Sequence, residues 1–242
     1  MQITGHRGMA SAAPENTLIS IEKAAKHGTK WIEIDVQLTQ DKQVVVIHDN
    51  TVNRCSNGTG AVRNFTYHEI KLLDAGSYFH TQFANEPIPS LKETLNLCLQ
   101  YNLALNIELK AYYGDNEHAL CDAVTEIINT MQYPEDKLLF SSFSLSALEI
   151  MKNTLPTVRR GFCDWSWRPD MVDIIKGLDL FSVHFNYRYV KKEYTKIIHE
   201  AGAKVIVWTA NDTDLLSHLK DIGVDNIITD FPDQFLLQPG TH

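Results

Sequence analysis

Residues 31–48 read WIEIDVQLTQDKQVVVIH, two β-branched runs joined by four polar residues. In the first run apolar and charged residues alternate, so Glu33 and Asp35 share one face of a strand. Four residues are too few for the crossover that a parallel neighbour needs. The second run, 43–48, is therefore expected to be the return arm of an antiparallel hairpin. This connection brings His48 back to the level of the two carboxylates.

Apolar runs alternate with amphipathic stretches along the rest of the chain. Eight strands are predicted, at 2–6, 31–38, 103–109, 137–142, 158–162, 180–185, 204–208 and 226–230. Helices are predicted at 15–27, 91–101, 117–131, 145–153, 170–176, 191–201 and 213–221, with a short tail at 231–237. Capping residues are expected at Asn16-Thr17, Ser90, Ser144 and Asp212. This α/β alternation indicates a (β/α)₈ TIM barrel first and an open doubly wound sheet second.

The chain is expected to be a single domain over 1–242, with one insertion at about 50–89. Its 242 residues, 44% of them hydrophobic, can bury one large core. The insertion follows the hairpin and precedes the next predicted helix. A barrel connection of this length is usually functional or a small subdomain. We expect it to form a lid beside the site.

Charge and composition exclude several classes of protein. Twenty-two basic residues stand against 30 acidic ones, a formal net charge of −8, which disfavours nucleic acid but allows a local basic pocket for one phosphate. The four cysteines form no C-x-x-C pair, so neither a disulfide framework nor a thiolate zinc site is expected. No signal-peptide pattern and no run of about 18 apolar residues occurs. We expect a cytoplasmic protein without stable membrane association.

Acidic residues recur near the ends of two predicted strands. Glu108 repeats the pattern of Glu33 and Asp35, because the polar residues around it share one face of the strand. Ionised carboxylates inside a barrel cost several kcal/mol unless a cation compensates them. Three carboxylates predict an oxygen-ligand site for one divalent cation, Mg²⁺ or Ca²⁺ rather than Zn²⁺. The alternative is a structural salt-bridge cluster with Arg7 and Lys110.

Two histidines end strands near these acids. His6 ends the first strand and His48 the hairpin arm, so both could project toward one mouth. Cleavage of a phosphodiester requires one proton removed from the nucleophile and one given to the leaving alkoxide, and two imidazoles can do both. The guanidinium group of Arg7 can donate two parallel hydrogen bonds to phosphoryl oxygens, and the ammonium group of Lys110 offers them a compact positive charge. Glu15 either serves the start of the first helix or reaches Arg7.

The order of these motifs resembles the glycerophosphodiester phosphodiesterase family. The resemblance covers nearly the whole chain, and the ordered set is far more specific than any single motif. The motifs are HRG at 6–8, PENT at 14–17, EIDV at 33–36, VVIHD at 45–49, ELK at 108–110, FSSF at 140–143, VWT at 207–209 with Asn211, and ITD at 228–230 with Pro232.

The resemblance implies a phospholipase-C-like barrel that hydrolyses glycerophosphodiesters to sn-glycerol 3-phosphate and an alcohol, using a divalent cation. It implies roles at seven positions: acid and base at His6 and His48, metal ligands at Glu33, Asp35 and Glu108, and phosphate binding at Arg7 and Lys110. The expected partner is therefore a small-molecule glycerophosphodiester.

Aromatic residues at other strand ends could complete the pocket. Phe185, with Tyr187, and Trp208 are predicted either to form an apolar wall for the glycerol carbons or the leaving group, or to pack under loops. Most of the other histidines are expected to be surface or structural residues: His27, His68, His80, His118, His184, His199 and His218.

Three other functions fit parts of the sequence. A lysophospholipid or other lipid phosphodiester as substrate would favour an exposed apolar lid, but the apolar residues of the insertion are scattered among polar ones. A non-catalytic phosphodiester-binding module would not need the intact set of histidines and carboxylates. Metal-dependent amidohydrolase barrels usually show His-x-His on the first strand, and 6–8 read HRG instead.

Overall fold

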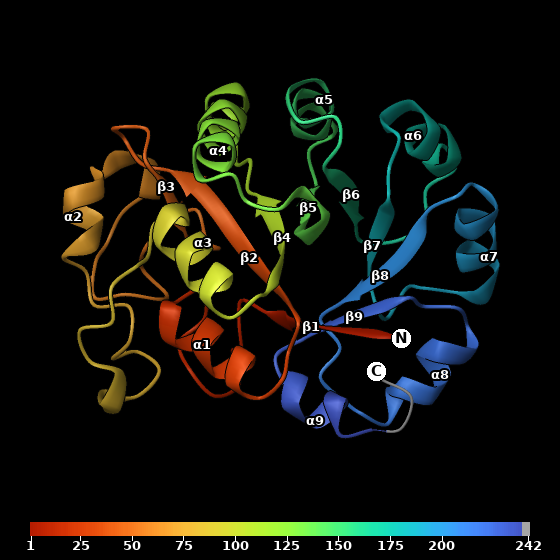
Figure 1. The fold of residues 1–242 in the computed structure, drawn as a ribbon, viewed down its shortest axis with the longest axis horizontal. Coiled ribbons are helices and arrows are strands. Elements are labelled where there is room, and N and C mark those ends of the chain that lie inside the picture. Colours follow the sequence, from red (N-terminus) through yellow and green to blue (C-terminus); the bar gives the residue numbers. More distant parts are fainter. Residues whose placement is uncertain (239–242) are drawn as a thin grey trace.

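A computed structural model describes residues 1–238. Its nine-stranded sheet has the order β1-β9-β8-β7-β6-β5-β4-β2-β3, and a pairing of β1 with β2 closes it (Figure 1). The strands are β1 (Gln2–His6), β2 (Trp31–Leu38), β3 (Val44–Val46), β4 (Ala104–Leu109), β5 (Leu138–Ser142), β6 (Arg159–Asp164), β7 (Ser182–Asn186), β8 (Lys204–Trp208) and β9 (Asn226–Thr229). All pairs except β2–β3 are parallel. The predicted TIM barrel is confirmed, and the open sheet is wrong.

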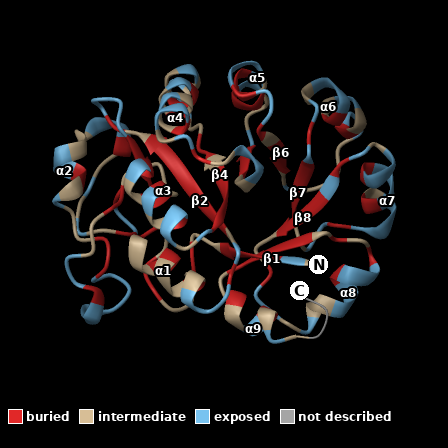
Figure 2. Cartoon of the chain, viewed as in Figure 1, coloured by how far each residue is buried: buried red, intermediate tan, exposed pale blue. Residues whose placement is uncertain are grey.

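A helix follows each barrel strand and packs on the outside of the barrel (Figure 1). The α-helices are α1 (Leu18–Lys26), α2 (Tyr67–Lys71), α3 (Leu91–Gln100), α4 (Glu117–Met131), α5 (Leu145–Thr154), α6 (Met171–Leu178), α7 (Lys192–Glu200), α8 (Leu215–Asp221) and α9 (Pro232–Leu236). Figure 2 shows buried strands inside a ring of helices whose outer faces are exposed. Only α2 lies outside this alternation, in the insertion.

Helix starts follow the predicted caps in three of four places. Thr17, Ser90 and Ser144 each accept a backbone N–H from the first turn of α1, α3 and α5. The first helix begins at Leu18 and not at Glu15, because Asn16 takes a left-handed φ of 57° that the helix cannot include. Asp212 accepts the N–H of Asp214 before α8 begins and caps no helix.

The core lies between the barrel and its helices. Ile32, Ile34 and Val36 of β2 are fully buried in an apolar cluster that includes residues of α1, α3 and β4. Because side chains alternate along a strand, the intervening Glu33 and Asp35 face the inside of the barrel. The hydrophobic effect that buries the isoleucines thus forces two carboxylates inward.

The predicted hairpin is present. Val36 of β2 pairs with Val46 of β3, and the N–H of Ile47 donates to the carbonyl of Asp35 over 2.9 Å. His48 follows directly, at the carboxyl end of the barrel. The insertion then packs against the hairpin through a small apolar cluster of its own, made of Val45, Ile47, Val52, Val62, Ile70, Ala75 and Ile88.

Candidate active site

The turn after β1 requires glycine at two positions, Gly5 and Gly8. Arg7 and Gly8 have φ values of 51° and 93°, and a Cβ on Gly8 would lie 2.4 Å from Ser20 Oγ. A Cβ on Gly5 would lie 2.2 Å from the Gly8 carbonyl oxygen. The turn aims the backbone N–H of Arg7 at Glu33 Oε2, 3.1 Å away. It therefore links the first strand to an acid of the second.

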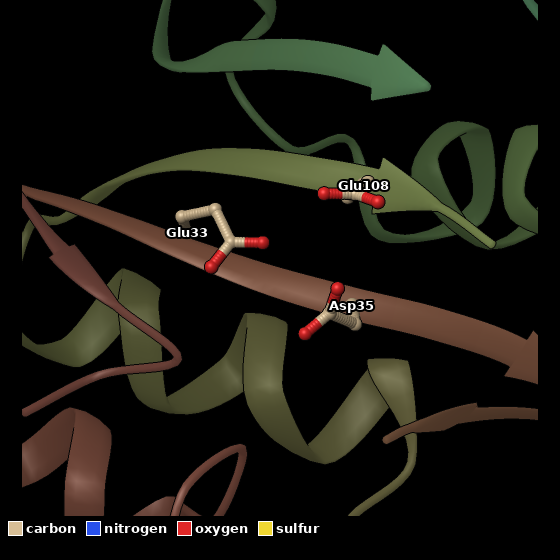
Figure 3. A group of neighbouring side chains, drawn as sticks. All are labelled: Glu33, Asp35 and Glu108. Atoms are coloured by element: carbon tan, nitrogen blue, oxygen red, sulfur yellow. The ribbon is translucent and has the colours of Figure 1, made fainter. Parts of the chain in front are cut away.

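Three carboxylates meet inside the carboxyl end of the barrel (Figure 3). Glu33 and Asp35 come from β2, and Glu108 comes from the neighbouring β4, where it is the register partner of Asp35. One ligand atom from each lies within 4.8 Å of the others. Figure 3 shows the carboxyl groups of the two strands turned toward a common space. The predicted acidic triad therefore assembles, and its geometry could hold a metal ion.

The three acids differ in their electrostatic surroundings. Burial raises the pKa of Glu33 well above its usual value, and repulsion by Asp35 and Glu108 adds to this. Burial acts in the same direction on Asp35, but Arg7 and Lys110 together hold its pKa below the usual range. Within the described chain, Glu33 forms no ion pair. The site thus has one buried acid more than its own cations compensate.

Arg7 and Lys110 lie on opposite sides of Asp35. Arg7 Nε is 3.2 Å from Asp35 Oδ2, and Lys110 Nζ is 3.6 Å from Oδ1 and 2.7 Å from Glu108 Oε1. Arg7 Nη1 also donates to Glu15 Oε1 over 2.5 Å. Of the two alternatives for Glu15, the structure shows the contact with Arg7, since Glu15 precedes the helix and does not cap it.

Each predicted catalytic histidine is bound by an aspartate. His6 Nδ1 is 2.6 Å from Asp230 Oδ1, which follows β9, the strand beside β1. Asn211 in turn donates its amide to Asp230 Oδ2 over 2.6 Å. A carboxylate at Nδ1 fixes the orientation and tautomer of the ring and leaves Nε2 for chemistry. Asn211 therefore supports this pair.

The second pair joins His48 to its chain neighbour. His48 Nδ1 is 2.7 Å from Asp49 Oδ1, and the Tyr112 hydroxyl donates to the His48 carbonyl over 2.5 Å. Burial lowers the pKa of His48, and the nearby Arg7 and Lys110 lower it further against the opposing effect of Asp35. A lowered pKa keeps the imidazole neutral near pH 7.

Both histidines, both cationic residues and two of the three acids line one pocket of about 420 Å³ at the carboxyl end of the barrel. This is the end where TIM barrels place their active sites. Its polar side consists of His6, Arg7, Glu33, His48, Asn106, Glu108 and Lys110. Four aromatic side chains also line it, namely Tyr112, Phe143, Trp165 and Trp208. The pocket thus combines charged groups with aromatic rings.

Trp208 lies where the sequence predicted it, and Phe185 does not. The Trp208 ring packs edge-on between Phe143 and Trp165, with centroids 5.7 and 5.2 Å away. Phe185 is fully buried in the apolar cluster between the strands and the outer helices. The alternation of β7 turns its neighbour His184 into the barrel, so Phe185 must face outward. Its assignment to the pocket is wrong.

Phe185→Ala is expected to affect stability and not substrate binding. Loss of a fully buried ring should lower the free energy of unfolding by about 3–5 kcal/mol. The matched variant is Phe143→Ala, whose ring lines the pocket and is 42% exposed. That change should raise KM with little loss of stability. Chemical denaturation and steady-state kinetics of both variants test this, and a raised KM at unchanged stability for Phe185→Ala would contradict it.

The insertion does not form the predicted lid. Within the described chain, no residue from 50–89 lines the pocket. The insertion lies beside the hairpin (Figure 1) and reaches the site through Arg54, which binds Asp49 and Glu15.

Among the other histidines, His184 lines the pocket. Burial lowers its pKa to about 3, and Ser182 Oγ lies 2.8 Å from its Nε2. It is a neutral, hydrogen-bonded residue.

Sequence reasoning missed the residues that support the site. Asp49 could have been found from its position next to His48. Asp230 could have been found because β1 and the last strand become neighbours when a barrel closes. Asn16, expected only near a helix start, donates to Asp35 Oδ2 over 2.9 Å. The local sequence pattern does not predict the contacts of Arg54, since they depend on how the insertion folds.

The chain matches the glycerophosphoryl diester phosphodiesterase family over residues 6–234. It belongs to this family. A glycerophosphodiester phosphodiesterase of Caldanaerobacter subterraneus subsp. tengcongensis is 34% identical, covering 97% of this chain and 96% of that protein. One of Bacillus altitudinis is 35% identical, with 96% of each chain covered. The motif resemblance is thereby confirmed.

Solved structures of the family agree with the fold. An Oleispira antarctica phosphodiesterase, determined in complex with the product sn-glycerol-3-phosphate, superposes with a TM-score of 0.94 and 34% identity. The match covers 98% of this chain and 95% of that one. No helix among residues 1–238 combines the length and the apolar character that crossing a membrane would require.

Proposed function

We propose that the protein hydrolyses glycerophosphodiesters to sn-glycerol 3-phosphate and an alcohol, with a divalent cation and two histidines. One observation carries the proposal: the triad of Glu33, Asp35 and Glu108 lines the same end of the barrel as two histidine–aspartate pairs. The Oleispira relative, whose structure contains sn-glycerol-3-phosphate as its product, supports the substrate class.

The residues present fit a divalent cation. Arg7 and Lys110 compensate Asp35 and Glu108, and the raised pKa of Glu33 marks a buried carboxylate without a cation of its own. Carboxylate oxygens suit Mg²⁺ or Ca²⁺. When bound, such an ion supplies Lewis-acid stabilisation of charge on phosphoryl oxygens. The salt-bridge alternative accounts for two of the acids and leaves Glu33 unexplained.

His6 and His48 are proposed to move the protons of the reaction. With Nδ1 of each ring held by an aspartate, Nε2 is left to face the pocket that both rings line. One imidazole takes a proton from the attacking hydroxyl, and the other gives a proton to the departing alkoxide. The carboxylates of Asp230 and Asp49 stabilise an imidazolium as it forms.

Arg7 and Lys110 are proposed to bind the phosphate group. Both line the pocket, and both are held in place by acids that already contact them, Glu15 for Arg7 and Glu108 for Lys110. Fixed positive charge next to the reacting phosphorus stabilises negative charge that grows on the phosphoryl oxygens. Trp208 and its aromatic neighbours offer an apolar surface for the carbon atoms of the substrate.

Release of the phosphate monoester from a substrate panel tests the function: sn-glycerol 3-phosphate from a glycerophosphodiester, and an acylglycerol phosphate from a lysophospholipid, whose acyl chain stays on the glycerol. The panel contains glycerophosphodiesters with different alcohols and one lysophospholipid, each assayed with chelator and with added Mg²⁺ or Ca²⁺. We expect turnover of the water-soluble diesters only with the metal. Turnover that withstands the chelator would reject the metal, turnover of the lysophospholipid alone would favour the lipid alternative, and product binding without turnover would favour a binding module.

A further inference from the structure

One arginine of the insertion, Arg54, binds two carboxylates of the barrel at once. Its Nε and Nη2 donate to Asp49 Oδ2 and Oδ1 over 2.7 and 2.8 Å. Its Nη1 and Nη2 donate to Glu15 Oε2 and Oε1 over 2.7 and 2.8 Å. Both contacts are bidentate, the geometry in which a guanidinium fork binds carboxylates most strongly and most directionally.

Both of these acids hold residues that line the pocket. Asp49 binds His48 Nδ1 at 2.7 Å, and Glu15 binds Arg7 Nη1 at 2.5 Å. Neither acid lines the pocket itself. A continuous chain of charge-assisted hydrogen bonds thus runs from His48 through Asp49, Arg54 and Glu15 to Arg7. It joins one proposed acid or base to one proposed phosphate-binding group.

We propose that Arg54 is a positioning residue for catalysis, which holds His48 and Arg7 in a fixed relative geometry through Asp49 and Glu15. This inference rests on the proposed function, since it concerns two residues of that mechanism. It also gives the insertion a role in catalysis: the insertion does not cover the substrate, but it fixes the far ends of two pocket-lining side chains.

The chemistry requires an arginine at this position. Hydrogen bonding by Arg54, opposed by partial burial, lowers the pKa of Asp49 to about 2, as expected for a guanidinium that binds an ionised carboxylate. Without Arg54, no other cationic side chain of the described chain pairs with Asp49 except His48 itself. A lysine has one charged atom and cannot make two bidentate contacts. Loss of the Arg54 guanidinium would free the carboxylates of Asp49 and Glu15 to turn away from His48 and Arg7.

The backbone around Arg54 is held rigidly against the barrel. Val52 is fully buried in the apolar cluster that joins the insertion to the hairpin, and its N–H donates to the Gly60 carbonyl over 3.0 Å. Thr51 forms a β-bridge with Ala61. Arg54 is therefore presented from an ordered segment, although its side chain is 46% exposed. An ordered anchor is what a positioning role needs.

Arg63 provides a matched control in the same insertion. Its side chain is 43% exposed, close to the value for Arg54, and it also bridges the insertion to the barrel. Its Nη1 donates to Asp115 Oδ1 over 3.0 Å and to the Tyr113 carbonyl over 3.1 Å. Neither acceptor lines the pocket or contacts a histidine. Removing Arg63 tests what loss of an insertion–barrel contact does by itself.

The experiment compares Arg54→Ala, Arg54→Lys and Arg63→Ala in the full chain. We expect Arg54→Ala to lower kcat/KM about 10- to 100-fold, the scale of a displacement of catalytic groups by about 1 Å. Millimolar guanidinium should restore part of this loss, Arg54→Lys should remain impaired, and Arg63→Ala should stay within threefold of the unmodified protein. Circular dichroism and Tm check that each variant is folded, with Arg54→Gln as a milder change if alanine unfolds the chain.

A second measurement does not depend on turnover. Imidazole ¹H–¹⁵N spectra should show His48 as a single Nδ1–H tautomer in the unmodified protein and as a tautomer mixture in Arg54→Ala, with the signal assigned from His48→Ala. Arg54 and Arg63 variants that lose activity equally, or an unchanged His48 spectrum in Arg54→Ala, would overturn the inference. A protein that turns over no glycerophosphodiester while its His48 spectrum still depends on Arg54 would instead reject the proposed function.

Discussion

Glu33→Ala should abolish metal-dependent hydrolysis and leave the fold intact. Among the described residues Glu33 is the triad member without an ion pair, so a bound cation would compensate its charge most and its removal breaks no salt bridge. We expect kcat/KM to fall by at least about 10³-fold, a loss on the scale of removing a group that stabilises the transition state directly. Kinetics with saturating Mg²⁺ or Ca²⁺ measure this change.

Stability provides the independent readout for Glu33. A buried carboxylate without a cation costs folding free energy, so the Tm of Glu33→Ala in chelator should equal or exceed that of the unmodified protein. Added metal should raise the Tm of the unmodified protein and not that of the variant. The control is Glu149→Ala, an exposed acid of α5, which should behave like the unmodified protein in both measurements. A Glu33 variant that keeps its activity or its metal-induced Tm shift would remove this residue from the site.

His6→Ala should lower kcat by at least about 10²-fold, because proton transfer by a positioned side chain contributes on that scale. The pH profile of the remaining activity should also lose one of its limbs. The proposed metal-induced rise in Tm should survive, since the His6 ring binds Asp230 and, within the described chain, forms no hydrogen bond or ion pair with the three acids. Stopped assays across a range of pH, together with melting curves, measure both effects.

The control for His6 is another histidine of the same chain. His27 is exposed at the end of α1, where its Nδ1 contacts the Lys23 carbonyl, so His27→Ala should keep normal turnover. Asp230→Asn should lie between the two variants, because an amide can keep the ring in place but cannot stabilise an imidazolium. Near-normal rates for His6→Ala would exclude this residue as acid or base.

Local patterns in the sequence predicted the barrel and the acidic triad. The alternation in β2 is sharp because charged and β-branched residues take turns, so the inward face could be read directly. The hairpin followed from a connection too short to cross over. Together they predict that Glu33, Asp35 and His48 lie at one end of the barrel.

Phe185 shows where attention to strand ends misleads. The stretch FSVHF at 181–185 alternates, with Phe181, Val183 and Phe185 on one face and Ser182 and His184 on the other. This alternation places Phe185 on the apolar face that packs against the helices, although its position at the end of the strand suggested the pocket. The residues that support the site could not be predicted for another reason. Asp230 lies 224 positions from His6, and Arg54 lies 39 positions from Glu15. Their contacts depend on tertiary structure that no local window contains.

The pairing of β1 with β9 bears on how the protein becomes active during synthesis. His6 leaves the ribosome well before Asp230, which holds its ring and lies 224 positions further along the chain, and before Asn211, which supports Asp230. A nascent chain that ended before β9 would lack the pairing partner of one edge of β1 and the carboxylate that holds the His6 ring. The orientation of this imidazole therefore depends on the strand that closes the barrel.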